Sequence, residues 1–237
     1  MPIRRIDIAG KSAFIEMGAD LMHREITSAI AVRGSCTIGL SGGSTPVPVY
    51  ERLTALPDID WQNVFVFLTD ERHIDADHPD SNQRLVRQSL ASRTHIPEDH
   101  LIFPDTHLPH EECAAEYAER LGAHLQSHAI DMVVLGMGPD GHITSLFPPV
   151  PKEAWGSSVA IATHTPLDES GKPLFAVRER ISTTFPVLKK SMSSLLLLGQ
   201  DKRALWETME KSTDTSVRWP IKELMQDQLV VLMEQSV

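Results

Sequence analysis

MVVLGMGPDGHITSLFPP, residues 132–149, is the stretch of sequence from which the fold of this chain can be predicted. It starts with four apolar residues, Met132 to Leu135, and becomes polar at Gly136. Three glycines, one aspartate and one histidine lie within residues 136–142. A buried strand that opens into a glycine-rich turn with ionisable side chains is where an open α/β sheet usually has its functional site. The stretch therefore predicts a strand of a parallel sheet with a site at its carboxyl end.

Predicted strands and helices alternate along the rest of the chain. The strand at 64–68 is apolar throughout, as expected for a strand covered on both faces of a sheet. The helix at 11–33 has apolar residues at helical spacing and ends before Gly34. Alternating strands and helices imply βαβ units, so we predict an α/β fold with a mostly parallel sheet flanked by helices. Further strands are expected at 36–40, 101–103, 158–163, 178–184, 194–198 and 229–232, and further helices at 47–56, 81–91, 111–126 and 201–211, the last capped by Asp201.

Length and composition fit a globular protein. The 237 residues could form one large domain or two small ones, and we expect a single domain over residues 1–237. No apolar run approaches the roughly 20 residues of a membrane-spanning helix, and the N-terminal stretch lacks the apolar core of a signal peptide. Cys36 and Cys113 occur in no metal or redox spacing, so we expect reduced, buried thiols and a cytoplasmic location.

The formal net charge of −10 limits the possible partners. It argues against nucleic acid or an anionic membrane surface as the main partner, and we predict neither. It is compatible with a small anionic substrate. A phosphate site would then depend on a few local Arg and Lys side chains and on backbone N–H groups.

Four predicted strands end in turns that contain glycine or charged residues, at Leu40, Leu68, Leu135 and Leu198. The carboxyl ends of parallel strands lie along the same edge of a sheet. We therefore expect a single cleft at this edge, which would collect residues 41–45, 70–72 and 140–142 together with Lys202.

Residues 136–141 match the pattern G-x-G-x-x-G after a strand, which can bind the pyrophosphate of a dinucleotide. Such a turn should open a long helix and should be followed, roughly 20 residues later, by an acid for the ribose hydroxyl. Here Pro148, Pro149 and Pro151 cut any helix short, and position 161 is an apolar Ile. The sequence therefore disfavours a nicotinamide cofactor.

Residues 39–43 match G-x-S-x-G after a strand, the pattern of the nucleophile elbow in serine hydrolases. An elbow would make Ser41 a nucleophile and should enter its helix at once, but the turn extends through Gly42, Gly43, Ser44 and Thr45. Glycines let a backbone approach an anion, and a helix N-terminus and hydroxyl groups supply donors. We favour an anion-binding loop, with a nucleophilic Ser41 and a purely structural turn as alternatives.

Charged residues directly follow the apolar strand at 64–68. Asp70 and Arg72 therefore lie at a strand's carboxyl end, where we favour a functional role over a solvated surface cluster. Arg72 could contact a phosphate in a bidentate manner, which Lys could not reproduce.

Two histidines four residues apart, His124 and His128, lack the glutamate of a zinc-protease helix. We expect both to be surface side chains. The same is expected of the isolated histidines His78, His95, His107 and His110.

Five motifs taken together resemble the 6-phosphogluconolactonase family. They occur in that family's order and approximate spacing and span nearly the whole chain. They are LSGGSTP at 40–46, TDER at 69–72 with Ser81 and Asn82 after it, GMGPDGH at 136–142 with SLFP at 145–148, ERISTT at 179–184, and GQDK at 199–202.

The resemblance implies a Rossmann-like, mostly parallel sheet with a small accessory lobe, as in glucosamine-6-phosphate deaminases and ribose-5-phosphate isomerases. It implies hydrolysis of 6-phospho-D-glucono-1,5-lactone to 6-phospho-D-gluconate, the second step of the oxidative pentose phosphate pathway, without a metal or organic cofactor. The partner would be a small-molecule sugar-phosphate lactone, and we expect a monomer or weak homodimer.

Site residues follow from the same resemblance. His142 is the expected general base, because an ordinary imidazole is largely neutral near pH 7 and can deprotonate an attacking water. Asp140 and Asp70 are the further catalytic candidates. The phosphate is expected to bind Gly42, Gly43, Ser44, Thr45, Arg72, Lys202 and Arg180, with Arg178 as the alternative to Arg180.

Three other activities stay open. A glucosamine-6-phosphate deaminase or sugar-phosphate isomerase would share the fold, but such relatives carry an acid soon after the histidine, where this chain has SLFP at 145–148. A serine esterase would use Ser41. A non-catalytic sugar-phosphate binding protein would keep the cleft without turnover, although His142 and Asp140 speak against it.

Overall fold

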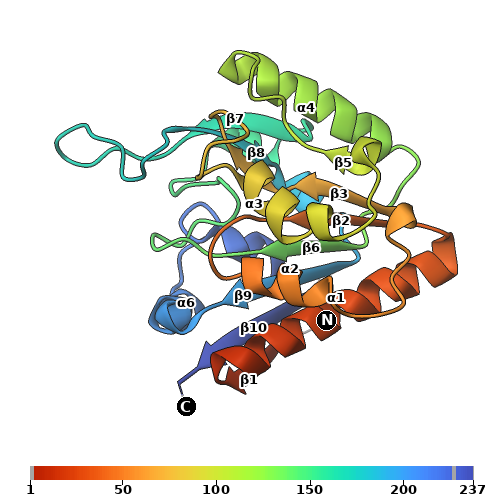
Figure 1. Cartoon of the computed structure of the whole chain (residues 1–237). Coiled ribbons are helices and arrows are strands. Elements are labelled where there is room, and N and C mark those ends of the chain that lie inside the picture. Colours follow the sequence, from red (N-terminus) through yellow and green to blue (C-terminus); the bar gives the residue numbers. More distant parts are fainter. Residues whose placement is uncertain (1–2, 226–227, 237) are drawn as a thin grey trace.

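Seven strands form one parallel sheet in the computed structural model, which describes residues 3–225 and 228–236 (Figure 1). All neighbouring pairs in this sheet run parallel, so the predicted mostly parallel α/β sheet is confirmed. In spatial order the strands are β1 (Arg4–Ala9), β10 (Leu229–Gln235), β9 (Ser193–Leu198), β6 (Met132–Leu135), β2 (Cys36–Leu40), β3 (Val64–Leu68) and β5 (Leu101–Ile102).

A second, antiparallel sheet forms the predicted accessory lobe. It consists, in spatial order, of β4 (Asp70–Arg72), β8 (Glu179–Thr183) and β7 (Ala160–His164). Asp70–Arg72 was expected as a charged turn and is a short strand instead, because its backbone pairs with β8. The register sets Arg72 opposite Arg180.

Helices cover both faces of the parallel sheet. One face carries α1 (Lys11–Arg33), α2 (Val47–Leu53) and α3 (Asn82–Ser89), and the other carries α4 (His110–His124), α5 (Phe185–Leu188) and α6 (Arg203–Lys211). Short 3-10 turns are η1 (Trp61–Asn63), η2 (Ala91–Arg93), η3 (Glu98–His100), η4 (Lys152–Trp155), η5 (Gln200–Lys202) and η6 (Pro220–Leu224). Across the described ranges, no helix has both the length and the apolar character that crossing a membrane requires.

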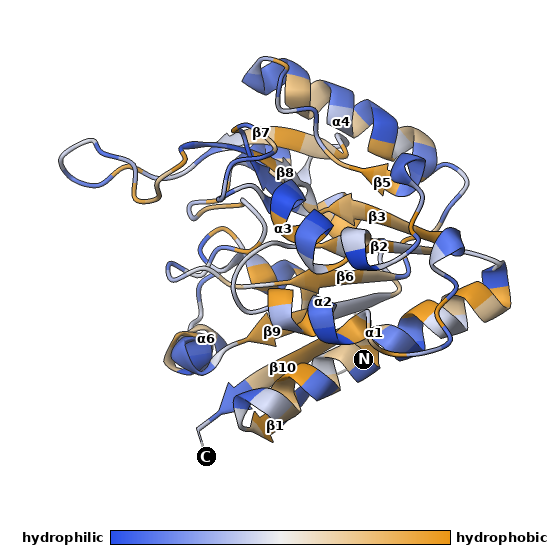
Figure 2. Cartoon of the chain, viewed as in Figure 1, coloured by the Kyte–Doolittle hydropathy of each residue, from blue (hydrophilic) through white to orange (hydrophobic). Residues whose placement is uncertain are grey.

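Side-chain alternation along the strands builds one hydrophobic core on each face of the parallel sheet. In β9, Leu195 and Leu197 join the core beneath α1 and α2, whereas Leu196 and Leu198 join the opposite core. Figure 2 shows the strands as a hydrophobic centre, while the helices carry hydrophilic residues on their outer sides. Burial on both faces explains why the strand at 64–68 contains no polar residue.

Local sequence features explain which predicted helix and strand boundaries are correct and which are wrong. α1 ends as predicted because Gly34 adopts a φ of 81° and its N–H donates to Ile30 O. The prediction that Asp201 caps a helix is wrong, since Asp201 lies within η5 and α6 begins at Arg203 without a side-chain cap. Strand β1 was not predicted, because three of its six residues are charged and it lies at the edge of the sheet.

Thr69 joins the two sheets as the single residue between β3 and β4. Its N–H donates to Leu40 O at 3.0 Å. Its carbonyl oxygen accepts hydrogen bonds from Thr183 N and Thr183 Oγ1, both at 2.9 Å. The carboxyl edge of the parallel sheet and the start of the accessory sheet are thus held together at one position.

Candidate active site

A cavity of about 280 Å³ opens at the carboxyl edge of the parallel sheet, beside the accessory sheet. Nearly all predicted site residues line it, and Asp140 contacts one of them, His142, from outside the lining. The cleft that strand direction predicted is therefore present. The predicted residues that line it are Gly42, Gly43, Ser44, Thr45, Asp70, Arg72, His142, Arg180 and Lys202.

Two glycines in the loop at 41–45 are required by close packing and by backbone conformation. A Cβ on Gly42 would lie 1.9 Å from Asn82 Oδ1, so no side chain fits between this loop and α3. Gly43 has a φ of 107°, which strongly favours glycine. Ser44 and Thr45 contribute hydroxyl groups to the cavity just before α2 begins. This geometry has the form of an anion-binding loop.

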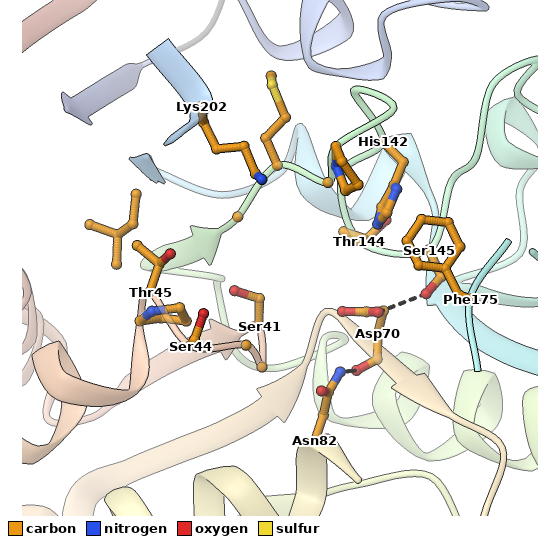
Figure 3. Close-up of a pocket in the computed structure, with 18 of the residues that line it drawn as sticks. Ser41, Ser44, Thr45, Asp70, Asn82, His142, Thr144, Ser145, Phe175 and Lys202 are labelled. Atoms are coloured by element: carbon orange, nitrogen blue, oxygen red, sulfur yellow. Dashed lines mark hydrogen bonds between the residues drawn. The ribbon is translucent and has the colours of Figure 1, made fainter. Parts of the chain in front are cut away.

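Lys202 extends toward the cavity on the same side as Ser44 and Thr45 (Figure 3). Its Nζ donates to Asp201 Oδ2 at 2.6 Å, so a neighbouring carboxylate partly balances its charge. His142 lies on the other side in this view. A ligand that contacts both Lys202 and His142 must therefore reach across the cavity.

The glycine-rich turn after β6 brings the His142 ring against its own backbone. Gly138 N donates to His142 O at 2.8 Å, and Gly141 N donates to Gly138 O at 3.0 Å. A Cβ on Gly138 would lie within 2.7 Å of three ring atoms of His142. The turn opens no helix, since the next helical turn is η4, so a dinucleotide-binding helix is absent from this part of the described chain.

Asp140 fixes the tautomer of His142. His142 Nδ1 donates to Asp140 Oδ1 at 2.5 Å, which leaves Nε2 with the lone pair. Burial raises the pKa of Asp140, but the hydrogen bond and charge of His142 outweigh burial, and the pKa lies below its ordinary value. Phe147 and Phe175 flank the imidazole, with ring centroids 4.3 and 5.4 Å away. His142 is thus an oriented imidazole with one nitrogen available as a base.

Two arginines stand side by side on the accessory sheet. Arg180 is 6% exposed, and burial together with the charge of Arg72 lowers its pKa to about 10. Their hydrogen bonds go to the carbonyl oxygens of Asp80 and Val177 rather than to carboxylates. Arg72 Nε is buried and has no hydrogen-bond partner among the described residues. Two adjacent guanidinium groups that are not bonded to carboxylates favour an anionic ligand.

The structure separates Arg180 from the alternative, Arg178. Arg178 is exposed and does not line the cavity, whereas Arg180 is buried and does. Strand alternation would place positions 178 and 180 on the same face, and the two differ because Arg178 precedes β8 and lies in the loop that leads into it.

The Glu71 side chain holds the backbone at Arg72 in place. Its carboxylate accepts hydrogen bonds from the backbone N–H groups of Arg72, Asn82 and Gln83 at 2.6 to 2.8 Å, and from Ser81 Oγ at 3.1 Å. Burial raises the pKa of Glu71 to about 7, against the opposing effect of these backbone donors. Glu71 therefore ties the N-terminus of α3 to Arg72.

The residues that line the cavity also include some that the sequence did not single out as site residues, among them Asn82, Thr144, Ser145 and Phe175. Ser145 Oγ donates to Asp70 Oδ2 at 2.7 Å, and Asn82 Nδ2 donates to Asp70 O at 2.8 Å (Figure 3). Asn82 and Ser145 belong to the motifs shared with the family, so the sequence could have indicated both as site residues. Thr144 has a φ of 50° and Phe175 lies in the loop before β8, and neither property has a sequence signature.

Ser41 lacks the surroundings of a nucleophile. Its Oγ is buried and has no hydrogen-bond partner among the described residues. Its carbonyl oxygen accepts a hydrogen bond from Tyr50 at 2.8 Å. A serine nucleophile needs a base within hydrogen-bond reach, so the geometry disfavours the elbow.

Comparison with known proteins gives consistent matches. The family described as glucosamine-6-phosphate isomerases/6-phosphogluconolactonase matches residues 9–232. A probable 6-phosphogluconolactonase of Dictyostelium discoideum is 36% identical, covering 91% of this chain and 90% of that protein. A 6-phosphogluconolactonase of Synechocystis sp. is 34% identical, with 96% and 94% covered. The crystal structure of a 6-phosphogluconolactonase from Shewanella baltica has a TM-score of 0.80 at 28% identity, covering 99% of this chain and 98% of that one.

Proposed function

The chain belongs to the family of glucosamine-6-phosphate isomerases and 6-phosphogluconolactonases, and we propose that it hydrolyses 6-phospho-D-glucono-1,5-lactone to 6-phospho-D-gluconate. The observation that carries this proposal is that His142, oriented by Asp140, and the pair Arg72 and Arg180 line one cavity. His142 with Asp140 can supply a base, and Arg72 with Arg180 can supply positive charge for the phosphate of a phosphorylated lactone.

The phosphate group binds to the loop at 42–45 and to cationic side chains. Gly42 and Gly43 allow close backbone approach, and the hydroxyl groups of Ser44 and Thr45 add donors. Lys202, Arg72 and Arg180 supply local positive charge in a chain whose formal net charge is −10. Local charge at a buried site outweighs a distant surface field that salt screens.

His142 activates water for attack on the lactone carbonyl. Its Nε2 accepts a proton from the water, whose oxygen forms a bond to C1 of the lactone. Asp140 stabilises the resulting imidazolium and holds the ring in place. Assistance of this kind contributes roughly 10²–10⁴-fold to a rate.

The reaction ends with cleavage of the bond between C1 and the ring oxygen. The tetrahedral intermediate collapses, and the ring oxygen leaves as a hydroxyl group by taking the proton from Nε2 of His142. This restores the neutral imidazole, and the new carboxylic acid then releases its proton to solvent to give 6-phospho-D-gluconate. Asp70 lines the cavity with its carboxylate fixed by Ser145, and we assign it to the sugar hydroxyls.

The negatively charged oxygen of the tetrahedral intermediate, the oxyanion, needs hydrogen-bond donors. Several N–H groups of the glycine-rich turn are not free to serve, because they are bonded within the turn. The N–H groups of Gly138, Gly141 and His142 are bonded to Gly138 O, His142 O or Asp140 within the turn itself. Donors for the oxyanion must therefore come from other groups that line the cavity.

The alternative of a glucosamine-6-phosphate deaminase has less support from the site. The residues after His142 supply Thr144 and Ser145 to the cavity, and Ser145 donates to Asp70. The chain offers no acid in the positions 143–148 that follow this histidine. Incubation with glucosamine 6-phosphate should release no ammonia.

We infer a cytoplasmic enzyme of the oxidative pentose phosphate pathway, acting at its second step. Its partner is the small-molecule lactone, with no nucleic acid or membrane involved, and it acts as a monomer or weak homodimer. His142 performs the hydrolysis in this proposal without a metal ion or organic cofactor at the reacting carbon.

Proton release from freshly prepared 6-phosphogluconolactone at fixed pH tests the proposed function. The lactone also opens spontaneously, so the catalysed rate must be taken as the difference from a matched reaction without protein. Acceleration that scales with protein concentration supports a lactonase. Tight binding of the product without acceleration would instead indicate a sugar-phosphate binding protein.

A further inference from the structure

We propose that the accessory sheet binds a zinc ion through His110, His164 and Glu179, on the face opposite to Arg72 and Arg180. Successive side chains on a strand point to opposite faces, and Glu179 directly precedes Arg180. The zinc site therefore lies outside the cavity and takes no part in the hydrolysis proposed above.

The three ligand residues come together from three elements. Glu179 begins β8, His164 ends β7, and the two are opposite each other in the strand register. Side chains of paired residues lie close together on one face of a sheet. His110 is the first residue of α4, which packs along β7 and β8 (Figure 1). One potential ligand atom of each residue lies within 4.8 Å of the other two.

Outer hydrogen bonds orient two of these ligands. His110 Nε2 donates to Arg180 O at 2.8 Å, so Nδ1 carries the free lone pair. His73 Nε2 donates to Leu108 O at 2.8 Å, and His73 Nδ1 lies 3.0 Å from Glu179 Oε2. Partners of this kind hold ligands in position in protein metal sites. His110, expected from the sequence to be an isolated surface histidine, is instead an oriented side chain.

The donor set suits zinc. Two imidazole nitrogens and one carboxylate oxygen, with water at the fourth position, form a common tetrahedral zinc environment. Ligand atoms at tetrahedral zinc are about 3.3 Å apart for bonds of about 2.0 Å. The exposed side chains of His164 and Glu179 can close the remaining distance by small rotations.

Two other histidine sites could compete for zinc. His124 and His128 are half-buried and stacked with ring centroids 4.2 Å apart, so they are not the free surface side chains expected. Burial lowers the pKa of His124 to about 4, and its Nε2 is bonded to Thr37 Oγ1. His142 and Asp140 form the second alternative. Within the described ranges, only the His110 group brings three ligand-type side chains together.

Zinc at this position would hold together the elements on which Arg72 and Arg180 rest. It would link β7, β8 and α4 at residues that neighbour Arg180 in sequence or contact it through its carbonyl oxygen. Metal that binds only the folded state raises the apparent stability by mass action. We therefore expect zinc to raise the melting temperature of the full chain.

Isothermal titration of the full chain with zinc chloride tests the site. We expect saturable binding of one zinc per chain, and cobalt bound at the same site should give the visible absorption of a four-coordinate ion. His164→Gln and Glu179→Gln should each weaken zinc binding by about 100-fold or more, and His73→Gln by about tenfold, the usual effect of losing an outer partner. His164 and Glu179 are exposed, so these two variants should fold normally, as circular dichroism can verify.

His128→Gln and His142→Gln serve as controls and should bind zinc like the unmodified chain. The proposal is overturned if the unmodified chain shows no saturable zinc binding. It is equally overturned if His164→Gln binds normally while either control loses binding. Because the readout is zinc binding, failure of this proposal leaves lactone hydrolysis untouched, and absence of hydrolysis leaves the zinc site untouched.

Discussion

A Cβ on Gly138 would lie 2.1 Å from Cε1 of His142, so the imidazole ring fills the space that a side chain at position 138 would need. The turn and the ring are therefore built as one unit. Gly136, two residues earlier, has no atom within 4 Å of the corresponding Cβ position. The two glycines form a matched pair for testing what the close approach contributes.

Gly138→Ala should lower kcat by about 100-fold, because a shift of roughly 1 Å in a catalytic group costs a rate factor of this size. The Michaelis constant should change little, since the phosphate-binding residues stay in place. Gly136 also lines the cavity, so Gly136→Ala could alter the Michaelis constant, but it should keep kcat nearly unchanged. Equal losses in the two variants would show that the close approach of Gly138 to His142 is unimportant.

His142→Gln should reduce kcat/KM for the lactone by roughly 10²–10⁴-fold, because the variant lacks the proton acceptor. A loss of less than about tenfold would rule out His142 as the general base. Asp140→Asn should also lower kcat, since an amide can hold the wrong tautomer of the imidazole. Both variants should retain binding of the product, which ligand-induced thermal shifts can measure.

Arg72→Met should weaken binding of inorganic phosphate and raise KM more than it lowers kcat. In the unmodified chain, phosphate at 100 times its dissociation constant should stabilise the fold by about 2.7 kcal/mol. Arg178→Met is the control, because Arg178 is exposed and outside the cavity. If the Arg178 variant loses phosphate stabilisation and the Arg72 variant keeps it, the assignment of the phosphate-binding arginine is wrong.

Glu71 should make stability depend on pH. Burial raises its folded pKa to about 7 from an ordinary 4.5, so between these values the folded chain holds more protons than the unfolded chain. The free energy of unfolding contributed by Glu71 should therefore fall as pH rises through this window, by on the order of 3 kcal/mol.

Urea denaturation of the unmodified chain and of Glu71→Gln at pH 5 and pH 8 can measure this contribution. The variant is always neutral at this position, so its stability relative to the unmodified chain should increase with pH. Glu153→Gln, at an exposed position, should show no such trend. Parallel pH profiles for Glu71→Gln and the unmodified chain would contradict the prediction.

Strand direction and apolar patterning were sufficient to predict the parallel sheet and the edge where the cavity forms. Leu40, Leu68 and Leu135 each end a buried strand, and the residues that follow them meet in one cavity. These relations are local in sequence, and the parallel arrangement brings them together without any knowledge of side-chain packing.

Tertiary contacts determine what the sequence could not predict. Asp70–Arg72 becomes a strand because β8 lies beside it, more than 100 residues later. Asn82 reaches the cavity because α3 packs against Gly42. Phe175 enters from the loop before β8, and nothing in the neighbouring sequence marks it as an aromatic residue that contacts His142.

The connection at Thr69 links the two groups of residues that bind the phosphate in the proposal above. Leu40, to which Thr69 donates, precedes the anion-binding loop, and Arg72 lies three residues beyond Thr69. A short covalent connection and hydrogen bonds therefore link the loop at 41–45 to Arg72. In the proposed binding mode the loop and the arginines contact the same phosphate, so this connection brings both sets of phosphate contacts within reach of one group on the ligand.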